Sequence, residues 1–311
     1  TPRAAAPLTA IVASTLPKLI ATEYVTAGGT DIPPGVGSET MALRIDGSST
    51  ATDPATIFRR DGVVAVRGVL DSAQLQQLAD AVDENLAAPG PWANDYTPQG
   101  GGGRFFGDYV NWERIAGYRQ AALHGPLPEL ARALLGETPR FFHEHTLVKE
   151  QDTHEVTPWH HDEPYYCVDG ASNVSLWVPL DPVPRSAGVE FIVGSHLWGR
   201  RFVPRKFVDQ SPYVDDDSDF ELVPDIDAMR DQHEIISFDM QPGDVVAFHY
   251  RTLHSAPGTA GRTTTRRRAV SFRYLGGDAR FATRPWLHSP PYEPITPGQP
   301  LDDKRFPLVS A

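Results

Sequence analysis

The chain has 311 residues, with 28 Lys and Arg against 40 Asp and Glu, and its formal net charge is -12. This acidic balance argues against nucleic acid or an anionic membrane as the partner and leaves neutral or cationic small molecules, amines included, as candidates. No apolar run is long enough to span a membrane, and no secretion signal is recognisable. The single cysteine, Cys167, suits a reducing cytoplasm and excludes a cysteine-based zinc cluster, so a metal would need His, Asp or Glu ligands.

The chain divides into an irregular segment and one long domain. Residues 1–55 are rich in Thr, Ala, Gly and Pro without a sustained period, which predicts an arm that packs on the core or on a neighbour. Such an arm is a candidate contact for a homodimer. Residues 56–311 are long enough for a barrel or sandwich with one core, so we expect a single catalytic domain there.

The first regular elements are a strand and two helices. The segment DGVVAVRGVL (61–70) predicts a short buried strand. A helix follows that begins at Asp71 or Ser72 and ends before Pro89-Gly90, because its leucines and valine recur on one helical face. A second helix is expected at about 127–135, ended by a glycine.

From residue 139 onward the chain consists mainly of short β-rich segments separated by turn residues. They are RFFHEHTLVKE, ASNVSLWVPLD, AGVEFIVGSH, HEIISFDMQPGDVVAFHY and TRRRAVSFRYLGG. Many short strands without intervening helices predict a mainly β protein, an antiparallel jelly-roll barrel with a helical buttress on its N-terminal side. Residues 200–232 form a long irregular insert with an acidic run, VDDDSDFE. We favour a solvated loop over a lid for this insert, and residues 276–311 form a Pro-rich C-terminal tail.

Two overlapping metal motifs occur in TPWHHDEPYY. The sequence can be divided as His160-x-Asp162 or as His161-x-Glu163, and alternate residues of an extended chain share a face in either case. Non-haem Fe(II) oxygenases hold iron through two histidines and one carboxylate, which leaves three positions open. A His-x-acid pair and one distant histidine would supply such a triad.

Two histidines could complete the triad. His249 continues an apolar strand and shares a face with Val245 and Ala247, which favours a packed core histidine. His254 follows that strand and opens the turn HSAPGT, where a side chain is better placed for open coordination. We therefore predict His254 as the distal ligand.

An arginine run, 266–268, precedes the strand AVSFRYL. Arginine binds a carboxylate in bidentate fashion, as a carboxylate-bearing co-substrate beyond the metal would require. If Ala269, Ser271 and Arg273 line the barrel interior, Arg267 points inward with them, and Arg266 and Arg268 point outward. Without the metal motif, a solvated charge cluster would be the preferred interpretation.

At this point the chain resembles the phytanoyl-CoA dioxygenase family of Fe(II)- and 2-oxoglutarate-dependent oxygenases. The resemblance rests on an ordered series: FRRDGVVAVRGVLD, HEHTLVKE, TPWHHDEPYY, VSLWVPLDPVPRSAGVEFIVGSH, QPGDVVAFHYRTLHSAPGT and RRRAVSFRY. It implies a double-stranded β-helix of the cupin-like jelly-roll type. It also implies Fe(II), 2-oxoglutarate and dioxygen, with hydroxylation of an unactivated C–H bond and release of succinate and carbon dioxide. Desaturation, epoxidation and cyclisation are further outcomes of the same chemistry.

The resemblance also assigns residues. The family pattern Trp-His-x-Asp falls on Trp159 to Asp162, so His160 and Asp162 are the implied ligands and His254 the distal one. His161 fills the variable position and would point away from iron. The arginine that binds 2-oxoglutarate falls on Arg267, although the 13-residue gap after His254 leaves Arg266 open. The residues implied beside the co-substrate are Lys149, Trp177, Ser255 and Ser271.

A substrate pocket is expected near the metal motif. Aromatic and polar side chains close to it in sequence, or in the glycine-rich GGGRFFGDYVNW, would line the pocket. The candidates are Trp159, His161, Tyr165, Tyr166 and Phe106. Aromatic residues beside strands more often belong to the core, and the sequence does not identify the substrate.

Two rival functions remain at this stage. The first is a cupin-type metal enzyme independent of 2-oxoglutarate, with His143, His145, Glu150 and His249 as its ligands. The second is a non-catalytic barrel that binds a ligand. The Trp159 to Asp162 match favours the oxygenase over the first, and the complete triad with its arginine favours it over the second.

Overall fold

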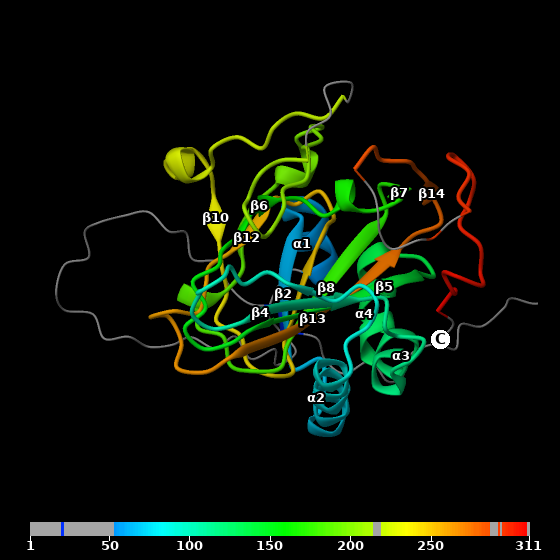
Figure 1. Cartoon of the computed structure of the whole chain (residues 1–311). Coiled ribbons are helices and arrows are strands. Elements are labelled where there is room, and N and C mark those ends of the chain that lie inside the picture. The colour runs from blue at the N-terminus through cyan, green and yellow to red at the C-terminus, as the bar shows by residue number, and fades with distance from the viewer. Residues whose placement is uncertain (1–19, 22–52, 214–218, 287–291, 293, 310–311) are drawn as a thin grey trace, which may run out of the picture.

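The computed structural model describes residues 20–21, 53–213, 219–286, 292 and 294–309. Figure 1 shows the elements along the chain. The α-helices are α1 Pro54–Asp61, α2 Ser72–Ala87, α3 Ala116–Leu123 and α4 Pro126–Leu135. The first strands are β1 Ile20–Ala21, β2 Val63–Arg67, β3 Asn94–Asp95, β4 Phe105–Tyr109, β5 Arg140–Lys149, β6 Thr157–His160 and β7 Val168–Asp169. The later strands are β8 Asn173–Pro179, β9 Glu190–Ile192, β10 Ile235–Ile236, β11 Val245–Phe248, β12 His254–Ala256, β13 Arg267–Leu275 and β14 Arg280–Phe281. Short 3-10 helices span Glu163–Tyr165, Arg185–Ala187, Ser195–Leu197 and Asp227–Gln232.

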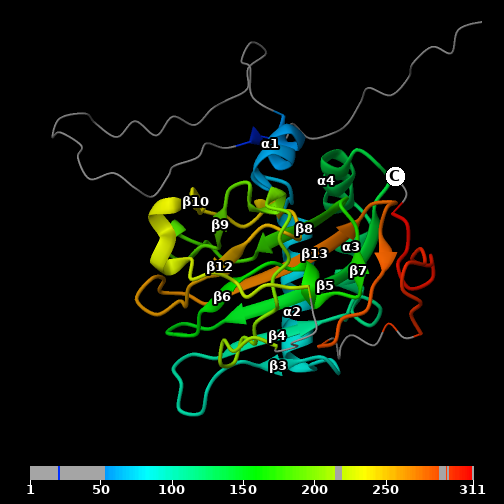
Figure 2. The ribbon, with the colours of Figure 1, turned by 90° about the horizontal axis from the view of Figure 1, so that it is seen from above.

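Two antiparallel sheets form the barrel. The larger has the order β1-β2-β11-β8-β13-β5-β4-β3, and the smaller has the order β10-β9-β12-β6. From β5 to β13 the chain passes back and forth between the two sheets, so strands distant in sequence become neighbours. Figure 2 shows β13, β5 and β4 side by side in the larger sheet. This arrangement confirms the predicted jelly-roll barrel, a double-stranded β-helix.

The two faces of the larger sheet have different partners. Val270, Phe272 and Tyr274 of β13 belong to the core that the helices cover, whereas Ala269 packs in a second core inside the barrel. Successive strand residues point to opposite faces, so Arg267, Ser271 and Arg273 share the interior face with Ala269. The predicted alternation along this strand is therefore confirmed.

The helices form the predicted buttress, although two of them were not expected. Helix α2 begins with a capping box, in which the Asp71 carboxylate accepts from Gln74 N at 2.9 Å and the Gln74 side chain accepts from Asp71 N at 3.0 Å. Helix α4 ends at Gly136, whose φ of 75° favours glycine. Helices α1 and α3 have only eight residues each, which is too short for a clear helical period, and α3 also lacks a side-chain cap.

The predicted segments outside the barrel are described only in part. Most of the arm, residues 1–55, lies outside the described residues, although β1 pairs with β2. The acidic run of the insert also lies largely outside them. The C-terminal segment packs against the barrel, and Phe306 is fully buried there beside Phe142. In the part of the chain that the structure describes, no helix is long and apolar enough to cross a membrane.

Candidate active site

Antiparallel pairing of β6 with β12 brings two histidines together inside the barrel. His160, the last residue of β6, is directly opposite His254, the first residue of β12. Their ring centroids lie 4.2 Å apart, and both side chains are buried. His254 was expected to open a turn after the preceding strand. It instead begins a strand of the smaller sheet, and the cross-strand register sets its distance from His160.

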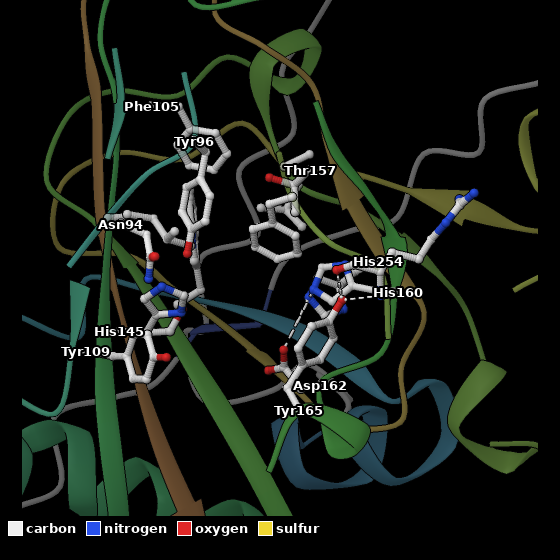
Figure 3. Close-up of a pocket in the computed structure, with 18 of the residues that line it drawn as sticks. Asn94, Tyr96, Phe105, Tyr109, His145, Thr157, His160, Asp162, Tyr165 and His254 are labelled. Atoms are coloured by element: carbon white, nitrogen blue, oxygen red, sulfur yellow. Dashed lines mark hydrogen bonds and ion pairs between the residues drawn. The ribbon is translucent and has the colours of Figure 1, made fainter. Parts of the chain in front are cut away.

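Asp162 joins the two histidines from the turn after β6. Its backbone has helical angles, and its N–H donates to Tyr250 O at 2.7 Å, so the His-x-Asp pair does not arise from extended-chain alternation. Asp162 Oδ1 lies 3.9 Å from His160 Nε2 and 3.8 Å from His254 Nε2, and Figure 3 shows the three side chains converging. Ligands about 2.1 Å from one ion can be at most about 4.2 Å apart. Both separations are below this limit, so the geometry fits a single metal ion held by His160, Asp162 and His254.

The hydrogen bonds of the two imidazoles leave one nitrogen of each free for a metal. His160 Nδ1 lies 2.7 Å from Pro158 O, and His254 Nδ1 lies 2.9 Å from Thr252 O. A carbonyl oxygen only accepts, so Nδ1–H donates in each case and the lone pair is on Nε2. Burial, with the neighbouring His254, lowers the pKa of His160 to about 3, and burial also lowers the pKa of His254. Both rings are therefore neutral at pH 7, as metal ligation requires.

The carboxylate of Asp162 is held on one side and open on the other. The Ser175 hydroxyl donates to Oδ2 at 2.9 Å, and Arg273 Nε lies 3.5 Å from the same oxygen. Burial opposes ionisation, but the charge of Arg273, the neighbouring histidines and the Ser175 hydrogen bond together hold the pKa of Asp162 well below its usual range. Asp162 is thus an anion whose Oδ1 remains available to a metal.

These three residues lie on the wall of a cavity of about 390 Å³. Its floor is the interior face of β4, β5, β8 and β13, and Figure 3 shows His145, Tyr109 and Asn94 across it from Asp162 and His160. This volume is within the range of small-molecule sites, roughly 300–1,000 Å³.

One end of the cavity carries two buried cations. Arg267 of β13 is directly opposite Lys149 of β5. Lys149 Nζ donates to the carbonyl oxygens of Glu155, Ala256 and Pro257, and Arg267 donates to Ala187 O. Burial, and then the charge of Arg267, lowers the pKa of Lys149, and burial lowers the pKa of Arg267 to about 10. Among the described residues neither side chain forms an ion pair with a carboxylate, so this end of the cavity favours an anionic ligand.

The neighbouring arginines point away from the cavity, as the alternation predicted. Arg266 Nη2 lies 3.7 Å from Asp83 Oδ1, and Arg268 forms a bidentate ion pair with Asp181. Arg266 is therefore on the opposite face of β13 from Arg267. Of the two arginines that the sequence left open as ligands of 2-oxoglutarate, Arg267 lines the cavity and Arg266 does not.

The other predicted site residues separate into two groups. Trp177, Ser271, Tyr165 and Tyr166 line the cavity. Ser255, Trp159, His161 and Phe106 do not, and each has a different environment.

The four residues outside the cavity are placed by local geometry. Ser255 donates to Thr157 O at 2.9 Å, and Trp159 Nε1 donates to Asp227 at 3.1 Å. His161 Nε2 accepts from Phe202 N at 3.0 Å, so it points away from the metal site as the resemblance implied. Phe106 packs beneath the helices because the interior face of β4 carries its neighbours, Phe105 and Tyr109.

The residues of the cupin alternative are not brought together. His143 and His145 line the cavity, but His249 packs outside the barrel, where Nε2 lies 2.9 Å from Ala171 O. Throughout the described ranges, His160, Asp162 and His254 form the sole group of three or more His, Cys, Asp or Glu close enough to share a metal ion. His249 is thus the hydrogen-bonded, packed histidine that the sequence favoured.

His249 predicts a specific dependence of stability on pH. Burial lowers its pKa to about 4, below the value of about 6.5 in an unfolded chain. Between these values the unfolded state binds the extra proton, so stability falls as pH falls from 6.5 to 4, by up to about 1.4 kcal/mol per pH unit. We expect His249→Gln to reduce this slope in urea unfolding series. The same change at the exposed His124 should leave it unaltered, and equal slopes in all three proteins would contradict the assignment.

Several cavity residues come from the insert and were not predicted. Phe207 packs edge-on against His160, with ring centroids 5.2 Å apart, and Arg205, Lys206 and Tyr213 also line the cavity. The Tyr165 hydroxyl donates to Arg205 O at 2.6 Å and accepts from Arg205 N at 2.8 Å. The described part of the insert therefore covers the metal site. Its aromatic residues were the feature of the sequence that could have indicated this role, but the acidic run drew the prediction toward a solvated loop.

The comparisons with known proteins agree with this fold and site. A family model described as phytanoyl-CoA dioxygenase (PhyH) matches residues 58–269. The structure is similar to that of the epimerase SnoN in complex with Fe3+, alpha ketoglutarate and nogalamycin RO, with 26% identity, a TM-score of 0.66, and coverage of 83% of this chain and 97% of that one. No curated protein matches the sequence.

Two further solved structures share the fold at lower identity. The alpha ketoglutarate dependent carbocyclase SnoK from nogalamycin biosynthesis is 22% identical with a TM-score of 0.66, covering 85% of this chain and 97% of that one. EctD from S. alaskensis, with 2-oxoglutarate and 5-hydroxyectoine, is 19% identical with a TM-score of 0.58, covering 89% and 98%.

Fold and site together define an oxygenase that depends on iron and 2-oxoglutarate. The chain belongs to the phytanoyl-CoA dioxygenase family. A small-molecule substrate fits this class.

Proposed function

We propose that this protein hydroxylates an unactivated C–H bond of a small organic molecule. His160, Asp162 and His254 hold the iron, and Arg267 with Lys149 binds the far carboxylate of 2-oxoglutarate. One observation carries the proposal: the same cavity contains two kinds of binding group. The two neutral histidines and the anionic Asp162 match a metal ion, and the buried Lys149 and Arg267, which have no carboxylate partner among the described residues, match a dicarboxylate co-substrate.

The bound iron and co-substrate supply activation of dioxygen, and 2-oxoglutarate leaves as succinate and carbon dioxide. The chain itself orients the reactants and excludes water. Ser175 and Arg273 fix Asp162 Oδ2, while the carbonyl groups of Pro158 and Thr252 fix the two imidazoles. Trp177 and Ser271 border the co-substrate between the triad and Arg267, and Phe207 covers His160.

Hydroxylation is one of several outcomes available to this class, as the epimerase and carbocyclase among the similar structures illustrate. Hydroxylation is recognised by its overall reaction, in which substrate-H, 2-oxoglutarate and dioxygen give substrate-OH, succinate and carbon dioxide. Under ¹⁸O₂ a hydroxylated product carries one labelled oxygen. Epimerised, desaturated or cyclised products carry none, and such a result would replace hydroxylation with the outcome observed. An epoxide would carry the label as well, so NMR of the labelled product must also show a new hydroxyl group.

The metal and co-substrate assignments can be tested without a substrate. We expect anaerobic addition of Fe(II) and then 2-oxoglutarate to metal-free protein to produce the visible charge-transfer band of the chelate. His160→Ala should abolish the band, because a ligand is lost. His143→Ala should retain it, because His143 lies outside the triad. If iron binds without a band, or if His143→Ala and not His160→Ala abolishes binding, the proposed site is wrong.

A further inference from the structure

The end of the cavity opposite Arg267 has no role in holding iron or 2-oxoglutarate. On β5 the residues that line the cavity alternate as His143, His145, Leu147 and Lys149. A strand rises about 3.3 Å per residue, so His145 lies about 13 Å along the strand from Lys149. A five-carbon dicarboxylate held at Lys149 and directed toward the triad does not reach that far. The His145 end is therefore left for the substrate.

His145 is a polar group without a partner. No hydrogen bond involves its ring in the part of the chain that the structure describes, and its Nε2 atom is buried. Burial, and then the charge of Arg273, lowers the pKa of His145 to about 3, so the ring is neutral at pH 7. A neutral imidazole offers one donor and one acceptor. Nε2 is packed against Gly107, so the cavity reaches the ring through its other nitrogen, Nδ1. A hydroxyl or carbonyl group of the substrate that pairs with Nδ1 adds a hydrogen bond worth about 0.5–1.5 kcal/mol.

Aromatic rings surround this imidazole. The Tyr109 ring packs edge-on against it at 5.2 Å between centroids, and Tyr96 lies over Gly107 next to it. A Cβ at Gly107 would lie 2.7 Å from Tyr96 Cε2 and 3.3 Å from His145 Nε2, so glycine is what allows the tyrosine ring to approach. Figure 3 shows Tyr96, Tyr109 and His145 on one wall, facing the metal triad. Flat aromatic walls favour a planar ring in the ligand.

The charges on the cavity wall disfavour binding of a substrate with a cationic amine. The charged residues that line it are Lys149, Arg205, Lys206, Arg267, Arg273 and Asp162, which is five cations against one carboxylate. Asp162 is paired with Arg273 and directed at the metal. The chain as a whole carries a net charge of -12, and on that ground the sequence left amines open, but the local field has the opposite sign.

We propose that His145 is a specificity-determining contact for the substrate, which is an uncharged compound with a planar ring system and a hydroxyl or carbonyl group bound by the imidazole. This inference rests on the proposed function, because it assigns the substrate class of the same site. It requires the reacting C–H bond to lie on the side of the ring that faces His160 and Asp162.

Equilibrium dialysis of three matched probes tests the inference on protein loaded with Fe(II) and 2-oxoglutarate under anaerobiosis. The probes are 2-naphthol, naphthalene and 2-(aminomethyl)naphthalene, which share a ring and differ in the polar group. We expect 2-naphthol to bind about tenfold more tightly than naphthalene, which corresponds to about 1.4 kcal/mol, and the amine to bind more weakly than both. His145→Phe, which keeps a ring of similar shape, should abolish the preference for naphthol, and His145→Gln should restore part of it.

The charge-transfer band of each loaded protein separates the two hypotheses. If wild type gives no band, the proposed function fails before any probe is added. If the band forms in wild type and in His145→Phe, then equal binding of 2-naphthol and naphthalene, tightest binding of the amine, or an undiminished naphthol preference in His145→Phe each overturns the inference about the substrate.

Discussion

Arg267→Ala should raise the concentration of 2-oxoglutarate needed for half-saturation by about 100-fold, while Arg266→Ala changes it less than about twofold. The two side chains are adjacent in sequence but on opposite faces of β13, one in the cavity and the other near Asp83. A buried, bidentate bond from arginine to a carboxylate is worth up to about 3 kcal/mol, which is about 100-fold or slightly more in affinity. The measurement is anaerobic titration of the charge-transfer band.

Arg267→Lys tests whether the planar guanidinium group, beyond its charge, contributes to 2-oxoglutarate binding. It keeps the charge and loses the planar fork, so an intermediate loss of about tenfold is expected. If Arg266→Ala weakened 2-oxoglutarate binding as much as Arg267→Ala, the face assignment of the arginine run would be wrong. If neither did, the anion site would lie elsewhere in the cavity.

Glu163→Ala should lower the free energy of unfolding of the metal-free protein by about 2–3 kcal/mol. Glu163 is buried, and its carboxylate forms a bidentate pair with Arg251 at 2.7 and 2.9 Å and lies 3.6 Å from Arg201. Removing one partner of a buried pair typically costs about 3–5 kcal/mol, and the value here is lower because both arginines are about one-third exposed.

Glu221 provides a matched control for that substitution. It also forms two bonds to one arginine, Arg200, at 2.6 and 3.0 Å, but both side chains are about half exposed. Glu221→Ala should therefore destabilise the protein far less than Glu163→Ala does, because solvent screens an exposed ion pair. Urea unfolding of the two variants gives the comparison, and equal losses would mean that burial does not set the strength of the Glu163 pair.

The sequence predicted the barrel well because the alternation along each strand is a local pattern. Alternation along β13 was enough to direct Arg267 inward. The choice of His254 over His249 followed from the apolar pattern of the strand that precedes both. His161 and Glu163 were correctly separated from His160 and Asp162 only through the family resemblance, since spacing alone fits both pairs.

What the sequence could not predict depends on register and on contacts between distant segments. Phe106 was chosen where Phe105 faces the cavity, because a shift of one residue along a strand exchanges the two faces. Trp159 shares the metal motif in sequence, yet its indole reaches Asp227 of the insert. The role of Phe207 was hidden because a loop that folds back over a barrel has no periodic pattern.

The pairing of β6 with β12 couples metal affinity to conformational stability. His160 and His254 become neighbours only when these two strands pair, and Asp162 is fixed only when the turn after β6 bonds to Tyr250. An unfolded chain thus lacks the ion's binding site, so free iron at 100 times its dissociation constant would add about 2.7 kcal/mol to the stability of the folded state. Withdrawal of iron by a chelator would remove that stabilisation. Iron supply would then govern how long the enzyme persists as well as how fast it works.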